Sequence, residues 1–87
     1  MTPVLVTWAD AHAVEGWLDP ANLDNGPCIV RSVGWLIADA KAGHVTLALS
    51  EDENGLVREV FHIGVAMVLD MIALDGSGAR LTAEPQP

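Results

Sequence analysis

The feature that most constrains this fold is a pair of apolar segments, residues 28–38 and 44–50, separated by a short polar connection. In the second segment apolar residues alternate with small or polar ones, which is the period-two pattern of a β-strand. In the first, neither face is cleanly polar, as expected for a central or bent strand. Gly34 in its middle predicts a sharp bend or a bulge. We therefore expect two adjacent strands on which the shorter apolar segments assemble.

Apolar segments on either side of this pair extend the predicted sheet. Residues 4–8 form a short run typical of a first strand. Residues 57–72 are ambiguous, because their apolar positions also fit the stripe of an amphipathic helix. Their Val and Ile content, a glycine within the run and the preceding Asn54-Gly55 turn favour two strands instead, at residues 56–63 and 65–74. Periodicity alone favours the helix, so the residues leave both interpretations open.

A long connection, residues 10–26, joins the first strand to the central pair. Asp19-Pro20 predicts the start of a helical turn, with the aspartate as cap and the proline at the first helical position. Connections of this length are frequently functional. The alternative, which we favour, is that Trp17 and Leu18 fold back and cap one end of the core.

The chain has 87 residues, enough for one domain, which we expect to span residues 1–78 and to be followed by a flexible C-terminal tail at 79–87. A core of this size gives marginal stability. Cys28 is the only cysteine, so no intramolecular disulfide supports the fold, and we interpret it as a small buried hydrophobe. The remaining support is self-association, and we therefore expect a homo-oligomer.

A net charge of −8, from twelve acids and four Lys or Arg residues, restricts the partners. It argues against a nucleic-acid polymer, because many cations are needed to neutralise its phosphates. It also argues against an anionic membrane surface. A small anion remains compatible, because one or two arginines hold a phosphate. No apolar run is long enough to span a membrane and no export signal is visible, so the expected location is cytoplasmic.

Several short elements occur in order within residues 4–74: Trp8-x-Asp10-Ala11, then Gly16-Trp17, then Ser32-Val33-Gly34-Trp35, and finally His62-Ile63. In this order they resemble a group of small phage and prophage proteins, most of which are described only as hypothetical. The family usually has an Ile-Pro-x-Gly turn between its last two strands, whereas this chain has Ile63-Gly64-Val65-Ala66 there.

The resemblance implies a mostly β domain: a small, strongly bent five-stranded barrel of the SH3-like or Sm-like kind, with a short helical turn in the loop after the first strand. It therefore favours two strands over a helix at residues 57–72. It also implies edge strands that pair between copies, and the cytoplasm of a bacterial host as the location. By analogy, phages encode compact oligomers that sequester nucleotide-derived immune signals of their hosts, which is an anti-defence role.

Catalytic and metal-binding chemistry is not expected. The chain lacks the established nucleophile, zinc and phosphate-loop motifs. Asp10, His12 and Glu15 offer one group of titratable side chains in the long connection. The three histidines, however, lie on three separate elements without metal-ligand spacing. We therefore predict a protein without enzymatic activity, bound metal or cofactor.

Ligand binding is the function that the residues favour. Trp17 offers a flat face for stacking on a base, while Arg31 and Arg58 offer strand-mounted guanidinium groups for a phosphate. Together with His12 they form the predicted ligand-binding set. The favoured hypothesis is an oligomer that binds a small nucleotide-type anion in pockets between copies. The alternative is a protein-interaction module that docks a host or phage protein, for which an acidic surface suits a basic partner.

Overall fold

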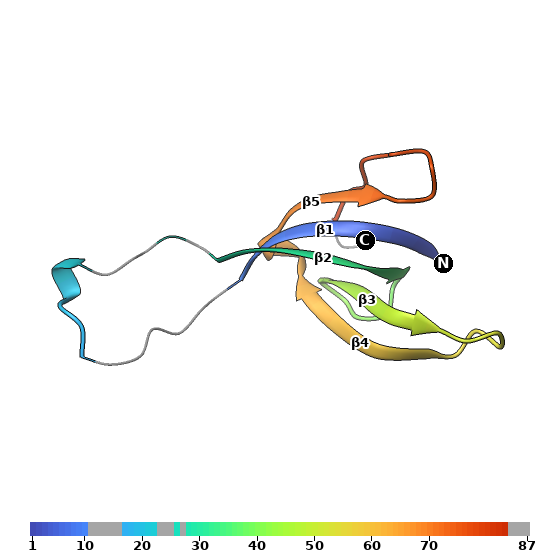
Figure 1. The fold of residues 1–87 in the computed structure, drawn as a ribbon, viewed down its shortest axis with the longest axis horizontal. Coiled ribbons are helices and arrows are strands. Elements are labelled where there is room, and N and C mark those ends of the chain that lie inside the picture. The colour runs from blue at the N-terminus through green and yellow to red at the C-terminus, as the bar shows by residue number, and fades with distance from the viewer. Residues whose placement is uncertain (11–16, 23–25, 27, 84–87) are drawn as a thin grey trace.

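The computed structural model describes residues 1–10, 17–22, 26 and 28–83, which contain one antiparallel sheet of five strands (Figure 1). The strand order is β4-β3-β2-β1-β5. The prediction of a mostly β, five-stranded domain is confirmed. The strands are β1 (Thr2–Asp10), β2 (Cys28–Ile37), β3 (His44–Glu51), β4 (Val57–Gly64) and β5 (Val68–Ala73), and two 3-10 turns are η1 (Pro20–Asn22) and η2 (Val65–Met67).

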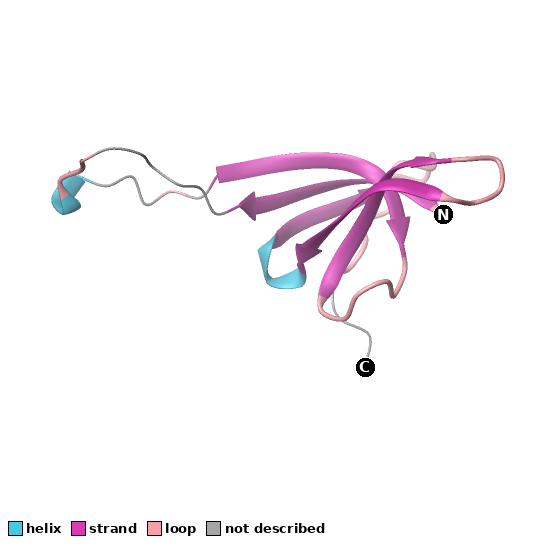
Figure 2. Ribbon diagram, turned by 90° about the horizontal axis from the view of Figure 1, so that it is seen from below, coloured by secondary structure: helices cyan, strands magenta, loops and turns pink. Residues whose placement is uncertain are grey.

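Gly34 marks the point at which the sheet bends. β2 pairs with β1 from Cys28 to Leu36, but with β3 only through residues 35–37. A Cβ on Gly34 would lie 3.0 Å from the carbonyl oxygen of Ala48 and 3.2 Å from the Cβ of Leu47, so a side chain here would crowd β3, and glycine allows the close approach. Beyond this point the β3–β4 hairpin diverges from β1 and β2 (Figure 2). The sheet is not closed, because β4 and β5 do not pair, but it is compatible with the predicted small barrel.

A small apolar core fills the inside of the bend. Its buried side chains lie at alternate positions of their strands, as the two-residue period of a strand requires. Trp8 packs at the margin of the core, and its indole Nε1–H donates a hydrogen bond to Ser32 Oγ at 3.0 Å. The buried members of the core are Val4, Val6, Val45, Leu47, Ile63 and Met71.

The strand β3 is buried on both faces in its first half. Thr46 and Ala48, which alternate with the core residues, are 1% and 0% exposed. Both are small, and larger side chains on the flanking strands cover them: Ala48 is paired with Trp35 on β2 and with Val60 on β4, and Thr46 is paired with His62. The face of β3 that carries Thr46 and Ala48, opposite the core face, is therefore also shielded from solvent.

Residues 57–72, for which the sequence left a helix open, form β4, η2 and β5. The hairpin turn before β4 contains Gly55 with a positive φ of 82°, and its amide donates to the carbonyl of Asp52 at 3.1 Å. β4 then pairs with β3 from Val57 to Gly64. The local turn signal outweighs helical periodicity here because β3 supplies a long ladder of backbone hydrogen bonds.

The predicted helical turn after the first strand is present as η1. The amide of Ala21 donates to the carboxylate of Asp19 at 3.0 Å, which is the capping arrangement expected for Asp19-Pro20. Figure 1 shows η1 well away from the sheet, and Trp17 and Leu18 are 104% and 48% exposed. The expectation that these two residues cap the core is therefore wrong. No helical segment of the described chain is long and apolar enough to cross a membrane.

The packing of individual residues bears on two further expectations. Residues 79–81, which the sequence assigned to a C-terminal tail, return to the sheet, where Arg80 forms a bridge with Ile72 of β5 and Leu81 packs on the core. The free backbone groups of β5, which ends the sheet, hold this returning chain in place. Cys28 is exposed rather than buried, because it begins β2 where only β1 flanks the strand.

Candidate functional site

The predicted ligand-binding residues do not converge in the structure. Trp17 is fully exposed and lies next to η1, away from the sheet. Arg31 is exposed on β2 opposite Thr7 of β1, whereas Arg58 is exposed on β4, beyond the intervening β3. His12 lies outside the described residues. Of the predicted set, the described members therefore occupy three separate parts of the molecule.

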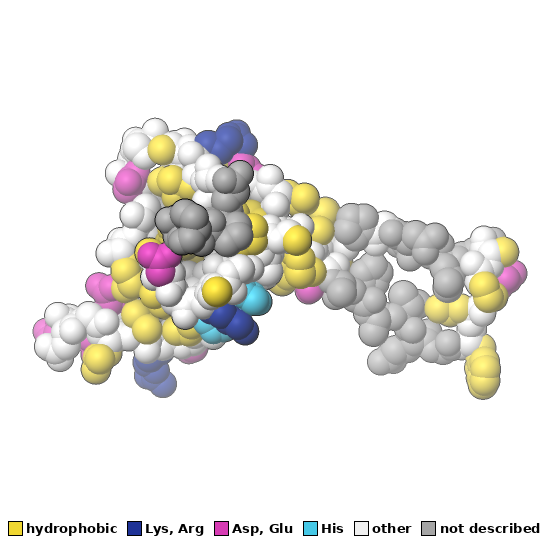
Figure 3. All heavy atoms as spheres, turned by 180° about the vertical axis from the view of Figure 1, so that it is seen from behind, with side chains coloured by type: hydrophobic (Ala, Val, Ile, Leu, Met, Phe, Trp, Pro, Cys, Tyr) yellow, Lys and Arg dark blue, Asp and Glu magenta, His cyan; other side chains and the backbone are white. Residues whose placement is uncertain are grey.

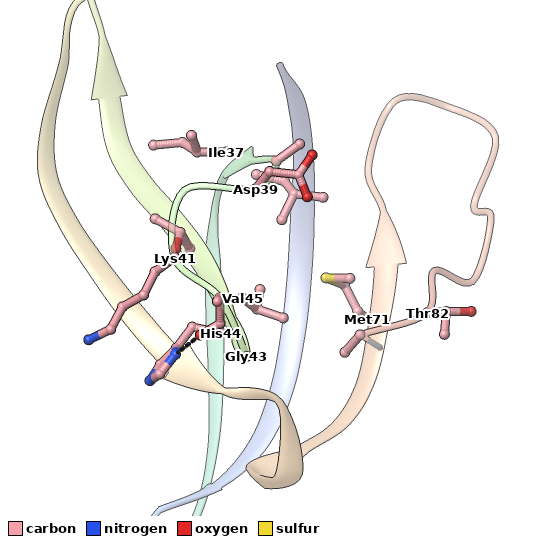
Figure 4. A pocket seen from close by; sticks show the side chains of 13 residues that line it. Ile37, Asp39, Lys41, Gly43, His44, Val45, Met71 and Thr82 are labelled. Atoms are coloured by element: carbon pink, nitrogen blue, oxygen red, sulfur yellow. Dashed lines mark hydrogen bonds between the residues drawn. The ribbon is translucent and has the colours of Figure 1, made fainter. Parts of the chain in front are cut away.

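A hollow of about 330 Å³ lies between the turn that joins β2 to β3 and the chain that follows β5 (Figure 4). Its floor is apolar, with Val45 of β3 and Met71 of β5 pointing toward each other. Its rim is polar and includes Asp39 from the turn and Thr82 from the returning chain. An open hollow of this kind accommodates a small ligand that is apolar on one side.

Three basic side chains lie beside this hollow: Lys41 and His44, which line it, and His62, which contacts His44. They are here called the basic cluster. The imidazole rings of His44 and His62 meet edge to face, with their centroids 6.2 Å apart. The carbonyl of Lys41 accepts a hydrogen bond from the amide of His44 at 3.2 Å, which ties the turn to the start of β3. In Figure 4 the side chains of Lys41 and His44 extend to the same side. Figure 3 shows a basic side chain against the histidines.

Hydrogen bonds at Nδ1 orient both rings. His44 Nδ1 lies 2.8 Å from the carbonyl oxygen of Ala42 and must donate, because a carbonyl only accepts. His62 Nδ1 lies 2.7 Å from the buried hydroxyl of Thr46, which is able to donate or accept. Each ring therefore uses one nitrogen for the fold and keeps Nε2 for another partner.

The basic cluster suits an anion better than a metal ion. Within the described ranges, no group of three or more His, Cys, Asp or Glu side chains is placed to hold a metal. Lys41 adds a permanent positive charge, which repels a cation and attracts a phosphate or carboxylate. Asp39, the acid of the same turn, points away from Lys41 and His44 (Figure 4), so it does not neutralise them directly.

Sequence reasoning missed the basic cluster because its members are far apart in the chain. His44 and His62 lie on adjacent strands, and only the register of the β3–β4 hairpin brings them together: Thr46 is opposite His62, and His44 is opposite Gly64. The Asn54-Gly55 turn was a usable signal, since a turn centred there fixes which residues of the two strands face each other.

Comparison with known proteins adds no identity to this geometry. No known protein family, curated protein or solved structure matches the chain.

Proposed function

We propose that this domain is a non-catalytic binding protein for a small anionic ligand, held by the basic cluster at the margin of the hollow. The observation that carries the proposal is the gathering of Lys41, His44 and His62 in a chain with a net charge of −8. Lys41 lies beside two imidazole rings, and Asp39, the acid of the same turn, points away from it, so this part of the surface favours an anion.

The basic cluster and the adjacent apolar floor of the hollow restrict the class of ligand. Lys41 provides a positive charge and N–H donors for a phosphate, and the apolar floor around Val45 and Met71 provides a surface for an uncharged ring or chain. A mononucleotide or a small cyclic nucleotide has both parts. This supports the nucleotide-type ligand that the sequence favoured, with Lys41, His44 and His62 in place of Trp17, Arg31, Arg58 and His12.

Isothermal titration with nucleotides and inorganic phosphate tests the site. We expect Lys41→Ala combined with His44→Gln to weaken nucleotide binding about tenfold or more, since each charge-assisted hydrogen bond contributes about 1.5–3 kcal/mol. Arg58→Ala is the matched control, because it removes a cation outside the basic cluster and should leave the affinity unchanged. Equal losses in the two variants, or no nucleotide binding by the wild-type chain, would overturn the proposal.

The same samples distinguish binding from turnover. Two neighbouring imidazoles are also able to act as general acid and base. Phosphorus NMR of the ligand after prolonged incubation should show it unchanged. Conversion that disappears in His62→Gln would make the protein an enzyme instead.

A second candidate function, docking to another protein, is favoured by Trp17. Its indole is 104% exposed and Leu18 beside it is 48% exposed. Tryptophan is the residue type most enriched among those that dominate binding at protein interfaces. If this function holds, a partner captured by the wild-type chain should be lost with Trp17→Ala and retained with Leu56→Ala, which changes another exposed apolar residue, 67% exposed, elsewhere on the surface.

A further inference from the structure

Besides the ends of β1 and β3, three longer stretches of strand edge lack a neighbouring strand in the described part of the chain. Two are the outer edges of β4 and β5, which end the sheet. The third belongs to β2, because β3 pairs only with residues 35–37 and leaves residues 28–34 flanked by β1 alone. An open strand edge presents unpaired backbone groups that are able to pair with another chain.

The two outer edges are protected. On β5, the amide of Ala73 donates to the carbonyl of Ala79 at 2.8 Å, and the amide of Leu81 donates to the carbonyl of Met71 at 2.7 Å. The returning chain therefore covers this edge. On β4, Glu59 has a positive φ of 56° in the middle of the strand, which breaks the regular backbone and adds a negative charge. Kinks and charges of this kind prevent strand addition.

The open edge of β2 is regular, and its hydrogen-bonding direction follows from the register. The amide of Leu74 donates to the carbonyl of Pro3 at 2.7 Å, so Pro3 and every second residue of β1 turn their backbone groups toward β5. The residues between them bond to β2, and Val4 and Val6 pair with Gly34 and Ser32. On β2 the backbone groups of the remaining residues therefore point to the open side, and these residues are Ile29, Arg31 and Val33.

Of these three residues, Ile29 and Val33 are apolar and Arg31 is basic, so the open edge carries no acid. Ile29 and Val33 are 52% and 57% exposed, and β2 contains no aspartate or glutamate. By contrast, the β3–β4 hairpin carries Glu51, Asp52, Glu53 and Glu59. For two chains of net charge −8, the approach that brings the fewest acids together is along β2.

We propose that β2 pairs antiparallel with β2 of a second copy and so joins two sheets across a two-fold axis. A second copy fits because its β2 edge is open in the same residues, whereas the outer edges of its β4 and β5 are protected. The register centred on Arg31 pairs Ile29 with Val33 of the other copy and uses every free backbone group of the three residues. It also places the two Arg31 side chains opposite each other, which weakens the dimer. The β2 edge does not include the basic cluster, so this pairing is independent of the proposed function.

Sedimentation of two Arg31 variants tests the pairing. Arg31→Pro removes an N–H that points away from β1, so the sheet keeps its internal bonds and the dimer should dissociate. Arg31→Ala keeps the N–H and removes the like-charge pair, so its dimer should be at least as tight as that of the wild type. Circular dichroism verifies that both variants are folded. A wild-type chain that stays monomeric at high concentration, or an Arg31→Pro variant that dimerises as the wild type does, would overturn the proposal.

Disulfide trapping provides a second test that does not depend on the proline variant. In the proposed register, residue 31 faces its own counterpart at a Cα separation of about 5.5 Å, within the range of a disulfide. In a Cys28→Ser background, Arg31→Cys should form a covalent dimer under mild oxidation. Val33→Cys in the same background faces residue 29 instead and should cross-link much less. Equal cross-linking of the two, or none with Arg31→Cys, would contradict the register.

Discussion

The two strands that flank β1 differ in how their outer edges are completed. On one side β5 is covered by the chain that follows it, through the bridge between Ile72 and Arg80 and the packing of Leu81. On the other side β2 is left open along residues 28–34, because β3 lies close to β2 at Gly34 but pairs with it only through residues 35–37. The chain after β5 therefore covers one edge from within, while the bend at Gly34 leaves residues 28–34 of β2 without a second neighbouring strand. Substitutions at the bend and at the covered edges should change the free energy of unfolding by amounts that reflect this difference.

The largest effect is expected at the bend. Gly34→Val places a side chain against the Ala48 carbonyl and Leu47, and we expect it to lower the free energy of unfolding by about 1–3 kcal/mol or more. Urea denaturation measures the loss. The exposed neighbour Val33→Ala should change stability by less than about 0.5 kcal/mol. Equal stability of the two variants would show that β3 does not approach β2 at Gly34.

The cover over β5 should be the next most sensitive element. Leu81 is half-buried against the core, so Leu81→Ala should lower the free energy of unfolding by about 1–2 kcal/mol. It should also speed amide exchange at Ala73, whose N–H bonds to Ala79. Thr82→Ala is the control, because Thr82 is exposed. If Leu81→Ala leaves both quantities at the values of the control, the returning chain does not protect this edge.

The kink in β4 predicts a smaller change in the free energy of unfolding, and this change is an increase. Glu59 adopts a positive φ that a side chain with a Cβ disfavours, so Glu59→Gly should raise the free energy of unfolding by about 0.5–1 kcal/mol. Glu59→Ala removes the charge but keeps the disfavoured backbone conformation, and should not give this gain. A destabilised Glu59→Gly variant would mean that the glutamate side chain, rather than the backbone, matters at this position.

The smallest effect on stability is expected in the turn between β5 and the returning chain, which contains Asp75 and Ser77. The hydroxyl and the amide of Ser77 donate to the carboxylate of Asp75 and lower the pKa of Asp75. A carboxyl group whose pKa is lower when folded stabilises the protein above its unfolded-state pKa, and this contribution is lost as the pH falls through the folded value. Wild type should therefore exceed Asp75→Asn slightly in stability at neutral pH, and the two should converge in acid. A difference that grows toward acidic pH would contradict this sign.

Local signals predicted the elements of the fold well. The Asn54-Gly55 turn, the cap at Asp19 and the bend at Gly34 each depend on a few neighbouring residues, and each has the expected structural role. The features that were missed depend on pairing between distant segments. The return of Arg80 onto Ile72 and the exposure of Cys28 follow from which edges the strands leave free, and that is set by the whole sheet.

In the candidate site, too, local features were predictable from the sequence and features that depend on strand pairing were not. Arg31, Arg58 and Trp17 are accessible side chains, but residue type alone does not say which of them share a surface. His44 and His62 meet because two strands pair in one register. A sequence carries that information only when the turn between the strands is used to count positions outward along both.

Residue-resolved amide exchange of the wild-type chain at low and high protein concentration tests the open edge of β2 most directly. Val30 and Ser32 bond to β1 and should be protected at both concentrations. We predict that Ile29, Arg31 and Val33 exchange rapidly in dilute solution and become protected at high concentration, when a second copy pairs with them. Rapid exchange of these three amides at every concentration, with Val30 and Ser32 still protected, would contradict the pairing of copies through this strand.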